Sequence, residues 1–281
     1  MIPPPPGTLE RWAFDYVVSD SLAHKLSPPP LPRGDLEASW ESGAPSRRAL
    51  RPGRPREMVL ADKKPKTPTG QQLRDPIKRA LLLHVFLHHE LQAAELFAWA
   101  MLTWVEVPRA LRLGWLKLAV DEARHMRLYA RELERLGKRF GDFPVRDWFW
   151  ERVPACESAS SFLALVGVGF EGGNLDHGAR FAQMLDDVGD HEAAAAERQV
   201  AHEEIAHVRF ATQWLEKLGS PLATLDDLRV LLPPPLSPLV LRGKPLARAA
   251  RLAAGMPAGL VDELEQSDET ARRPRASEGR A

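Results

Sequence analysis

The sequence predicts an all-α fold: a bundle of four long helices, preceded by an irregular segment and followed by short helices. Four segments of roughly 28 to 33 residues carry helical patterning, and proline or glycine bounds them. Such segments are far longer than the usual helix of about 11 to 12 residues. Long helices joined by short or moderate links form a four-helix bundle.

Composition sets the broad class of the protein. The chain has 281 residues, no net formal charge, 44% hydrophobic residues and 27% charged residues, as in ordinary soluble proteins. One cysteine, Cys156, excludes an intrachain disulfide and any Cys-rich zinc or iron–sulfur site. No signal peptide is visible and no apolar run approaches the roughly 20 residues of a membrane span, so we expect a cytoplasmic protein without membrane contact.

Residues 1–75 are predicted to form a proline-rich, partly basic extension packed on the bundle. Proline clusters cannot lie inside helices, but the stretch from Leu9 to Leu26 is expected to form one short helix. Residues 47–79 contain 11 lysines and arginines against three acidic residues. This basic segment is either a solvated arm or an electrostatic surface for an anionic substrate such as RNA.

The predicted bundle covers residues 76–219. Asp75 is expected to cap the first helix, with Pro76 at its first position, and Pro108 ends it. The second helix starts at Pro108 and stops at Gly137. The third covers 159–189 and the fourth 190–219. Short helical pieces follow over 220–265, and 266–281 is predicted to be a disordered tail.

Two long helices each carry a glutamate and a histidine three residues apart. Glu122 and His125 on the second helix share one helix face, as do Glu204 and His207 on the fourth. One such pair is weak evidence, whereas two pairs on two long helices are strong evidence for a shared site. The fourth helix does not carry the zinc-protease motif, because His202 and His207 are five residues apart and that motif needs four.

The other two helices each offer one glutamate in apolar surroundings, Glu90 and Glu171. Glu122 follows Glu90 by 32 residues and Glu204 follows Glu171 by 33, so the chain looks like two copies of one helical hairpin. Burying four unpaired carboxylates would cost many kcal/mol, and two divalent metals would neutralise them. Four carboxylates and two imidazoles suit iron or manganese, with positions left open for oxygen.

The motifs around these residues resemble a known family. "DEARHMRLYARELERLG", "FEGGNLDHG" and "EEIAHVRFATQWLEKLG" are similar to the core motifs of the ferritin-like family catalogued as domain of unknown function 455, and the likeness covers most of the chain. The resemblance implies a ferritin-like bundle with two iron ions, with manganese or a mixed pair as alternatives. Its implied ligands are Glu90, Glu122, His125, Glu171, Glu204 and His207.

One stretch departs from the family pattern. In "FEGGNLDHG" an arginine and fewer glycines would be expected, and this departure is expected to reshape the substrate pocket.

Other residues are alternative ligands or candidates to contact the ligands from behind. Glu95 competes with Glu90, but they lie about 140° apart on a helix, and the resemblance favours Glu90. Glu95 is then expected behind the ligands or at the surface. Glu203 competes with Glu204, and only Glu204 repeats the Glu122–His125 spacing. Further candidates to orient the ligands are Asp121, Asp176 and Tyr129, although packing is the favoured role of Tyr129; His84, His88 and His89 are interpreted as structural or exposed.

The ligand set favours an oxygen-activating oxidoreductase that acts on an organic substrate and takes electrons from an external donor. The alternatives are an iron-oxidising or iron-storing protein, a tRNA-modifying hydroxylase that uses the basic segment, and a non-catalytic metal-binding bundle. A small-molecule substrate is favoured over nucleic acid.

Overall fold

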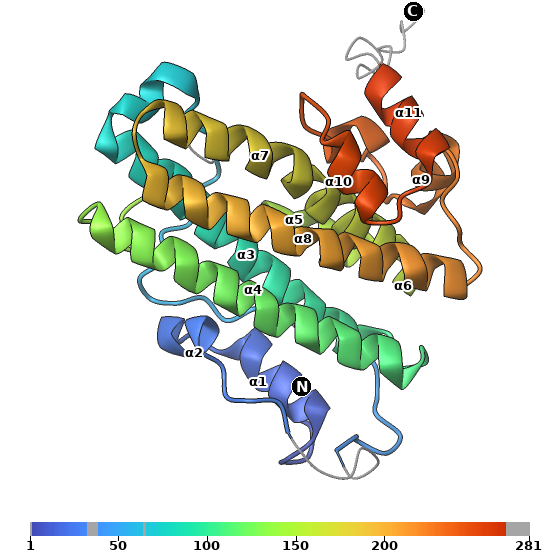
Figure 1. Ribbon diagram of the computed structural model, residues 1–281. Coiled ribbons are helices and arrows are strands. Elements are labelled where there is room, and N and C mark those ends of the chain that lie inside the picture. The colour runs from blue at the N-terminus through green and yellow to red at the C-terminus, as the bar shows by residue number, and fades with distance from the viewer. Residues whose placement is uncertain (1, 33–38, 64–65, 268–281) are drawn as a thin grey trace, which may run out of the picture. The chain divides into compact units, whose positions relative to one another are not determined.

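A computed structural model describes residues 2–32, 39–63 and 66–267. Over these ranges the chain is helical and has no β-strand, and one isolated bridge joins Leu60 to Val145 (Figure 1). The predicted all-α class is confirmed. The predicted disordered tail lies outside the described residues from position 268 onward. No helix in the described part of the chain combines the length and apolarity needed to cross a membrane.

The chain divides into two compact units. Unit 1 comprises Met1–Ala155 and Phe181–Arg198, and unit 2 comprises Cys156–Arg180 and Gln199–Ala281. Helices α7 (Glu171–Asp187) and α8 (His191–Lys217) contribute residues to both units.

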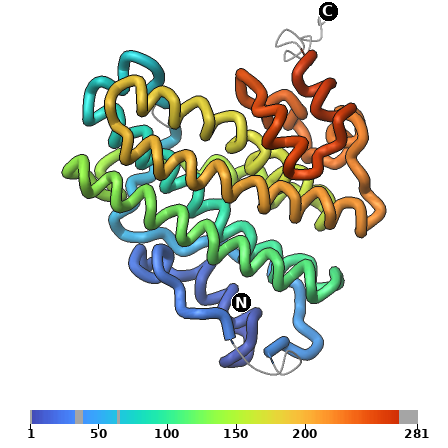
Figure 2. The backbone as a smooth tube through the Cα atoms, viewed as in Figure 1, coloured from blue at the N-terminus to red at the C-terminus, as the bar shows by residue number. Residues whose placement is uncertain are grey.

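Unit 1 is built around two long helices, α3 (Pro76–Thr103) and α4 (Arg109–Arg135), which lie side by side (Figures 1 and 2). Helix α1 (Leu9–Val18) packs on α3, and α2 (Leu22–Leu26) packs on α4. The shorter elements are η1 (Gly70–Arg74), α5 (Trp148–Arg152) and η2 (Val153–Ala155). The single helix predicted from Leu9 to Leu26 is therefore two helices, because the Ser21 side chain caps a new start for α2.

The predicted limits of the long helices in unit 1 hold closely. Asp75 caps α3 by accepting a hydrogen bond from the Ile77 amide at 2.8 Å, with Pro76 in the first turn. Helix α3 ends at Thr103, a turn before Pro108, and Pro108 occupies the N-cap position of α4. Gly137 follows α4 with a φ of +68°, the left-handed conformation expected of a terminating glycine.

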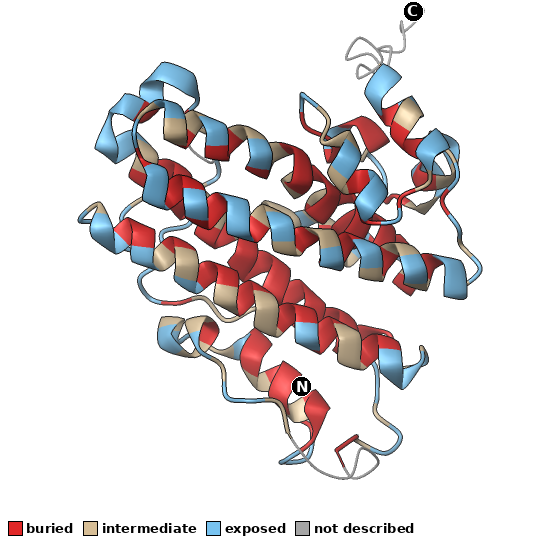
Figure 3. Cartoon of the chain, in the orientation of Figure 1, coloured by how far each residue is buried: buried red, intermediate tan, exposed pale blue. Residues whose placement is uncertain are grey.

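Helix α3 is buried on every side. All residues between Ala80 and Thr103 are buried except Phe86 and His89, whereas α4 alternates buried and exposed residues (Figure 3). An amphipathic helix has one rotation that buries its apolar stripe, but a helix apolar all round has no such preference. Polar contacts must therefore contribute to fixing the rotation of α3.

Unit 2 begins with the predicted third helix, which is helical throughout but not regular. It consists of α6 (Ala159–Phe162), a π-helical segment η3 (Leu163–Phe170) and then α7. A Cβ on Gly167 would lie 2.4 Å from Cβ of Ala211 in α8, so the glycine allows an unusually close helix contact. Runs of π-helix inside α-helices are rare and are often found at functional sites.

The rest of unit 2 contains the predicted short helices. They are α9 (Leu225–Leu231), η4 (Pro238–Leu241), α10 (Arg248–Ala253) and α11 (Ala258–Gln266). Elements α9 and η4 pack on η3, and α11 packs on α9 and α10.

Three arginines of the basic segment 47–79 are held by ion pairs, whereas most of the other described lysines and arginines of the segment are exposed. The buried Arg47 pairs with Glu41 at 2.7 Å, and Arg79 pairs with Asp190 at 2.8 Å. Arg54 pairs with buried Glu95 at 2.8 Å. The solvated-arm interpretation is wrong at these positions, because each guanidinium anchors the segment to other parts of unit 1.

Candidate metal centre

The first hairpin places its three predicted ligands inside unit 1. Glu90 lies on α3, and Glu122 and His125 lie on α4, with exposures of 3%, 0% and 0%. Nδ1 of His125 lies 2.9 Å from Oε2 of Glu122. The i, i+3 spacing thus brings an imidazole nitrogen and a carboxylate oxygen together on the inner face of α4, as the sequence predicted.

The second hairpin repeats this arrangement in unit 2. Glu204 and His207 are buried on α8, and Nδ1 of His207 lies 2.9 Å from Oε2 of Glu204. The neighbouring residues behave differently, since His202 is exposed and Glu203 is only partly buried. These exposures agree with the choice of Glu204 over Glu203.

Glu171 is the first residue of α7, directly after the π-helical segment. Its side chain is buried, and Nδ2 of Asn174 donates a hydrogen bond to Oε2 of Glu171 at 3.1 Å. Sequence reasoning did not single out Asn174. Its position three residues after Glu171 was the available signal, because that spacing places both on one helix face.

Four of the six predicted ligands form one buried group. Glu90, Glu122, His125 and Glu204 each offer a ligand atom, and these atoms all lie within 4.8 Å of one another. Glu171 and His207 are buried but are not members of this four-residue group. The structure therefore contains a buried cluster of glutamates and a histidine that could bind metal ions.

The donor set fits a first-row metal. An octahedral ion with ligands at about 2.1 Å holds neighbouring ligand atoms about 3.0 Å apart. The His125–Glu122 and His207–Glu204 separations of 2.9 Å match that value. Imidazole with carboxylate is a ligand mixture suited to iron or manganese.

Two carboxylates predicted to lie near the ligands make ion pairs of their own. Glu95 is fully buried, so its placement at the surface, one of two alternatives, is wrong; it contacts Lys25 and Arg54. Asp176 is buried and accepts two hydrogen bonds from Arg251, at 3.0 and 2.7 Å.

Tyr129 and Asp121 differ sharply in their surroundings. The buried Tyr129 hydroxyl donates a hydrogen bond to Oε2 of Glu197 at 2.7 Å, and its ring packs near Phe86. Asp121 is partly exposed and pairs with Arg124 on the same helix at 3.3 Å. Sequence reasoning missed Glu197, which is 5% exposed.

Two histidines of α3 outside the ligand set, His84 and His88, have structural roles. His84 stacks on Phe140, and its Nε2 accepts a hydrogen bond from the Gly141 amide at 2.9 Å. Burial, aided by nearby His88, lowers the pKa of His84 to about 4, so the ring is neutral at pH 7. His88 is also buried, lies 3.2 Å from Asp147, and has a pKa lowered mainly by burial.

A comparison with protein families identifies the chain. A family model matches residues 18–262, which is most of the sequence. The chain belongs to the family described as "Protein of unknown function (DUF455)". No curated protein matches the chain, and no solved structure matches it. The family description names no activity.

Proposed function

We propose that this member of DUF455 is a ferritin-like four-helix-bundle protein with two metal ions, iron or manganese, that uses dioxygen to oxidise an organic substrate. The proposed ligands are the four clustered residues together with Glu171 and His207. The observation that carries the proposal is the buried convergence of three glutamates and one histidine within 4.8 Å. Divalent cations would neutralise the charge that three clustered glutamates bring into the interior of the protein.

Each residue has a distinct task in this proposal. His125 and His207 would each supply an imidazole to one metal ion, and Glu90, Glu122, Glu171 and Glu204 would supply the carboxylate ligands. The bound metals would supply dioxygen activation, with electrons from an external donor. The protein contributes a site closed to water, since every proposed ligand is at most 3% exposed. Asn174 orients Glu171 through its hydrogen bond.

A small organic substrate is favoured over RNA. Arg47, Arg54 and Arg79 belong to the basic segment but already make ion pairs within unit 1, which lowers the charge left for phosphates. A substantial RNA affinity that falls between low and moderate salt would favour the tRNA-modifying alternative instead.

The metal content of the purified protein tests the proposal. Wild-type protein reconstituted with ferrous or manganous ions should hold close to two ions per chain, and Glu204→Ala should lose most of them. Glu203→Ala is the matched control, because Glu203 is the adjacent, partly buried glutamate, and it should keep both ions. Wild-type protein that binds no metal under these conditions would overturn the proposal.

Oxygen consumption separates the two catalytic alternatives. Reduced, iron-loaded protein should consume dioxygen faster when a small-molecule fraction of cell extract and a reductant are added. Sustained turnover of added ferrous iron alone would instead assign iron oxidation as the function.

A further inference from the structure

Each lone glutamate ligand is followed five residues later by another buried carboxylate. Glu95 follows Glu90 on α3, and Asp176 follows Glu171 on α7. Glu95 is 0% exposed and Asp176 is 2% exposed. Both form ion pairs with buried or largely buried cations that lie outside the four long helices. The two hairpins therefore share a feature in addition to their ligand types.

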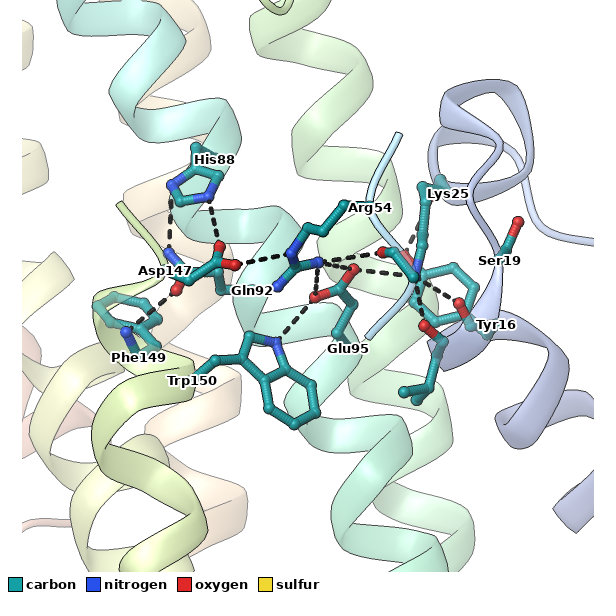
Figure 4. Close-up of polar contacts among 12 residues, drawn as sticks. Tyr16, Ser19, Lys25, Arg54, His88, Gln92, Glu95, Asp147, Phe149 and Trp150 are labelled. Atoms are coloured by element: carbon teal, nitrogen blue, oxygen red, sulfur yellow. Dashed lines mark hydrogen bonds and ion pairs between the residues drawn. The ribbon is translucent and has the colours of Figure 1, made fainter. Parts of the chain in front are cut away.

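The N-terminal extension supplies the cations for Glu95. Nζ of Lys25 lies 2.8 Å from Oε1 of Glu95, and Nη1 of Arg54 lies 2.8 Å from both carboxylate oxygens (Figure 4). Nε1 of Trp150 donates to Oε2 at 2.8 Å. Lys25 is itself held by the carbonyl oxygens of Tyr16 and Val17, at 2.6 and 3.0 Å. Glu95 thus joins α3 to three other segments of unit 1.

The C-terminal segment supplies the cation for Asp176. Arg251, which is 1% exposed, binds both carboxylate oxygens in a two-point contact. The backbone amides of Gly243 and Ala247 also donate to Asp176, at 2.8 and 2.7 Å. Four hydrogen bonds therefore tie α7 to the segment around η4 and α10 within unit 2.

Because of the spacing of five residues, these contacts control the helix rotation and therefore the position of the ligand side chains. Five residues correspond to about 140° of rotation and about 7.5 Å along the helix axis, so the carboxylate points away from the ligand face one turn further on. A helix rotation of about 20° would move a side-chain tip roughly 6 Å from the axis by about 2 Å. Metal–ligand distances tolerate only about 0.2 Å.

Apolar packing by itself fixes the rotation of α3, and of the first turn of α7, weakly. Helix α3 is buried on every side, as described above, so burial does not favour one face over another. Next to Glu171, Gly172 and Gly173 present no side chain to pack, and a Cβ on Gly172 would lie 3.1 Å from Nη1 of Arg251. Directional ion pairs can select one rotation where apolar burial does not.

We propose that Glu95 and Asp176 are positioning residues, each of which sets the metal ligand of its own hairpin through a cation supplied by a flanking segment. Glu95, held by Lys25 and Arg54, positions Glu90; Asp176, held by Arg251, positions Glu171. The flanking segments are thus parts of the metal centre. This inference rests on the proposed two-metal function, and it predicts that each contact serves one of the two metals.

Manganese titration of the full chain tests this inference, with electron paramagnetic resonance to separate coupled pairs from single ions. The wild type should bind close to two Mn²⁺ with a coupled spectrum. Asp176→Asn and Glu95→Gln should each keep one tight ion, weaken the other at least tenfold, and show the six-line spectrum of a single Mn²⁺. Arg251→Lys, which keeps the charge but loses the two-point geometry, should weaken one ion by a smaller factor.

A buried ion pair of the same kind provides the matched control. Glu10 pairs with Arg112 at 2.8 Å, both are buried, and Arg112 lies ten residues before Glu122, about 15 Å along α4. Glu10→Gln should lower the melting temperature and leave both manganese affinities unchanged. If Glu10→Gln loses as much metal as Asp176→Asn, the metal loss is due to general destabilisation of the fold. That result would overturn the inference.

Double variants show which metal each contact serves. Adding Asp176→Asn to Glu171→Ala should have little further effect, whereas adding it to Glu90→Ala should abolish tight binding. Two unperturbed ions in both Asp176→Asn and Glu95→Gln would overturn the inference while leaving the proposed function intact. Failure of the wild type to bind would instead overturn the proposed function. If Asp176→Asn loses its circular-dichroism signal for helix, Arg251→Lys is used in its place. Wild-type manganese affinities in Arg251→Lys would then overturn the inference.

Discussion

The two hairpins carry the same ligand types in different surroundings. Four residues after the histidine ligand, α4 has Tyr129, which binds Glu197, while α8 has Ala211, which lies against Gly167. Six residues before the lone glutamate, α3 has His84, and the π-helical segment has Leu165. The first hairpin is thus packed with large and titratable side chains, and the second relies on close backbone approach.

This difference shows which features the chemistry constrains. The ligand atoms and their i, i+3 spacing are repeated because a metal requires particular donors at particular distances. The buried carboxylate five residues after each lone glutamate is also repeated, although its cation comes from a different segment each time. The surrounding packing has many physical solutions, since volume and patterning suffice to fill a core.

The largest expected effect on stability tests the close approach of Gly167 and Ala211 in the second hairpin. Gly167→Ala should lower the free energy of unfolding by about 3 kcal/mol, because the new Cβ would lie 2.4 Å from that of Ala211 and force the backbones apart. Chemical denaturation measures the change. Gly173→Ala is the control: its Cβ would meet the Leu241 carbonyl oxygen at an ordinary 3.5 Å, so it should gain about 0.5 to 1 kcal/mol. Equal losses in both variants would contradict the comparison.

A smaller effect on stability comes from His84 in the first hairpin, and it depends on pH. Burial lowers the pKa of His84 from 6.5 to about 4, so the unfolded chain binds a proton at this residue before the folded chain does. The resulting stability is fully present above pH 6.5 and is lost as the pH falls toward 4. Between pH 6.5 and 5 the loss should be about 1.6 kcal/mol.

His84→Gln isolates this contribution, because glutamine can accept the Gly141 amide hydrogen bond but does not titrate. Urea denaturation at pH 6.5 and pH 5 should show a smaller acid-induced loss in the variant than in the wild type. His88 is present in both proteins and cancels in the difference. Parallel pH dependence of the two proteins would contradict the assignment of acid sensitivity to His84.

The smallest expected effect on stability concerns the hydrogen bond between Tyr129 and Glu197. Tyr129→Phe removes a hydrogen bond to the buried Glu197 carboxylate while keeping the ring near Phe86. It should lower the free energy of unfolding by roughly 1 to 2 kcal/mol, measured by urea denaturation. The variant should still bind two manganese ions, since Tyr129 is not a proposed ligand. Loss of an ion in Tyr129→Phe would show that the pair also supports the metal centre.

The sequence by itself determined the helical class, the limits of α3 and α4, and the two pairs of a glutamate and a histidine three residues apart. Proline and glycine mark helix ends because they cannot continue the backbone pattern, as at Asp75–Pro76 and Gly137. Periodicity places Glu122 with His125 and Glu204 with His207, since residues three apart share a helix face. These signals are local, and local geometry is readable without knowledge of the fold.

Only the tertiary structure decided what holds those helices in place. Spacing along α3 could not reveal that Glu95 contacts Lys25 and Arg54, 70 and 41 residues earlier in the chain. Likewise, Arg251 is 75 residues from Asp176, and nothing local links them. The π-helical segment before Glu171 also has no local signature in the sequence, because its wide turn depends on packing against neighbouring elements. Contacts distant in sequence arise from chain packing, which local propensity does not encode.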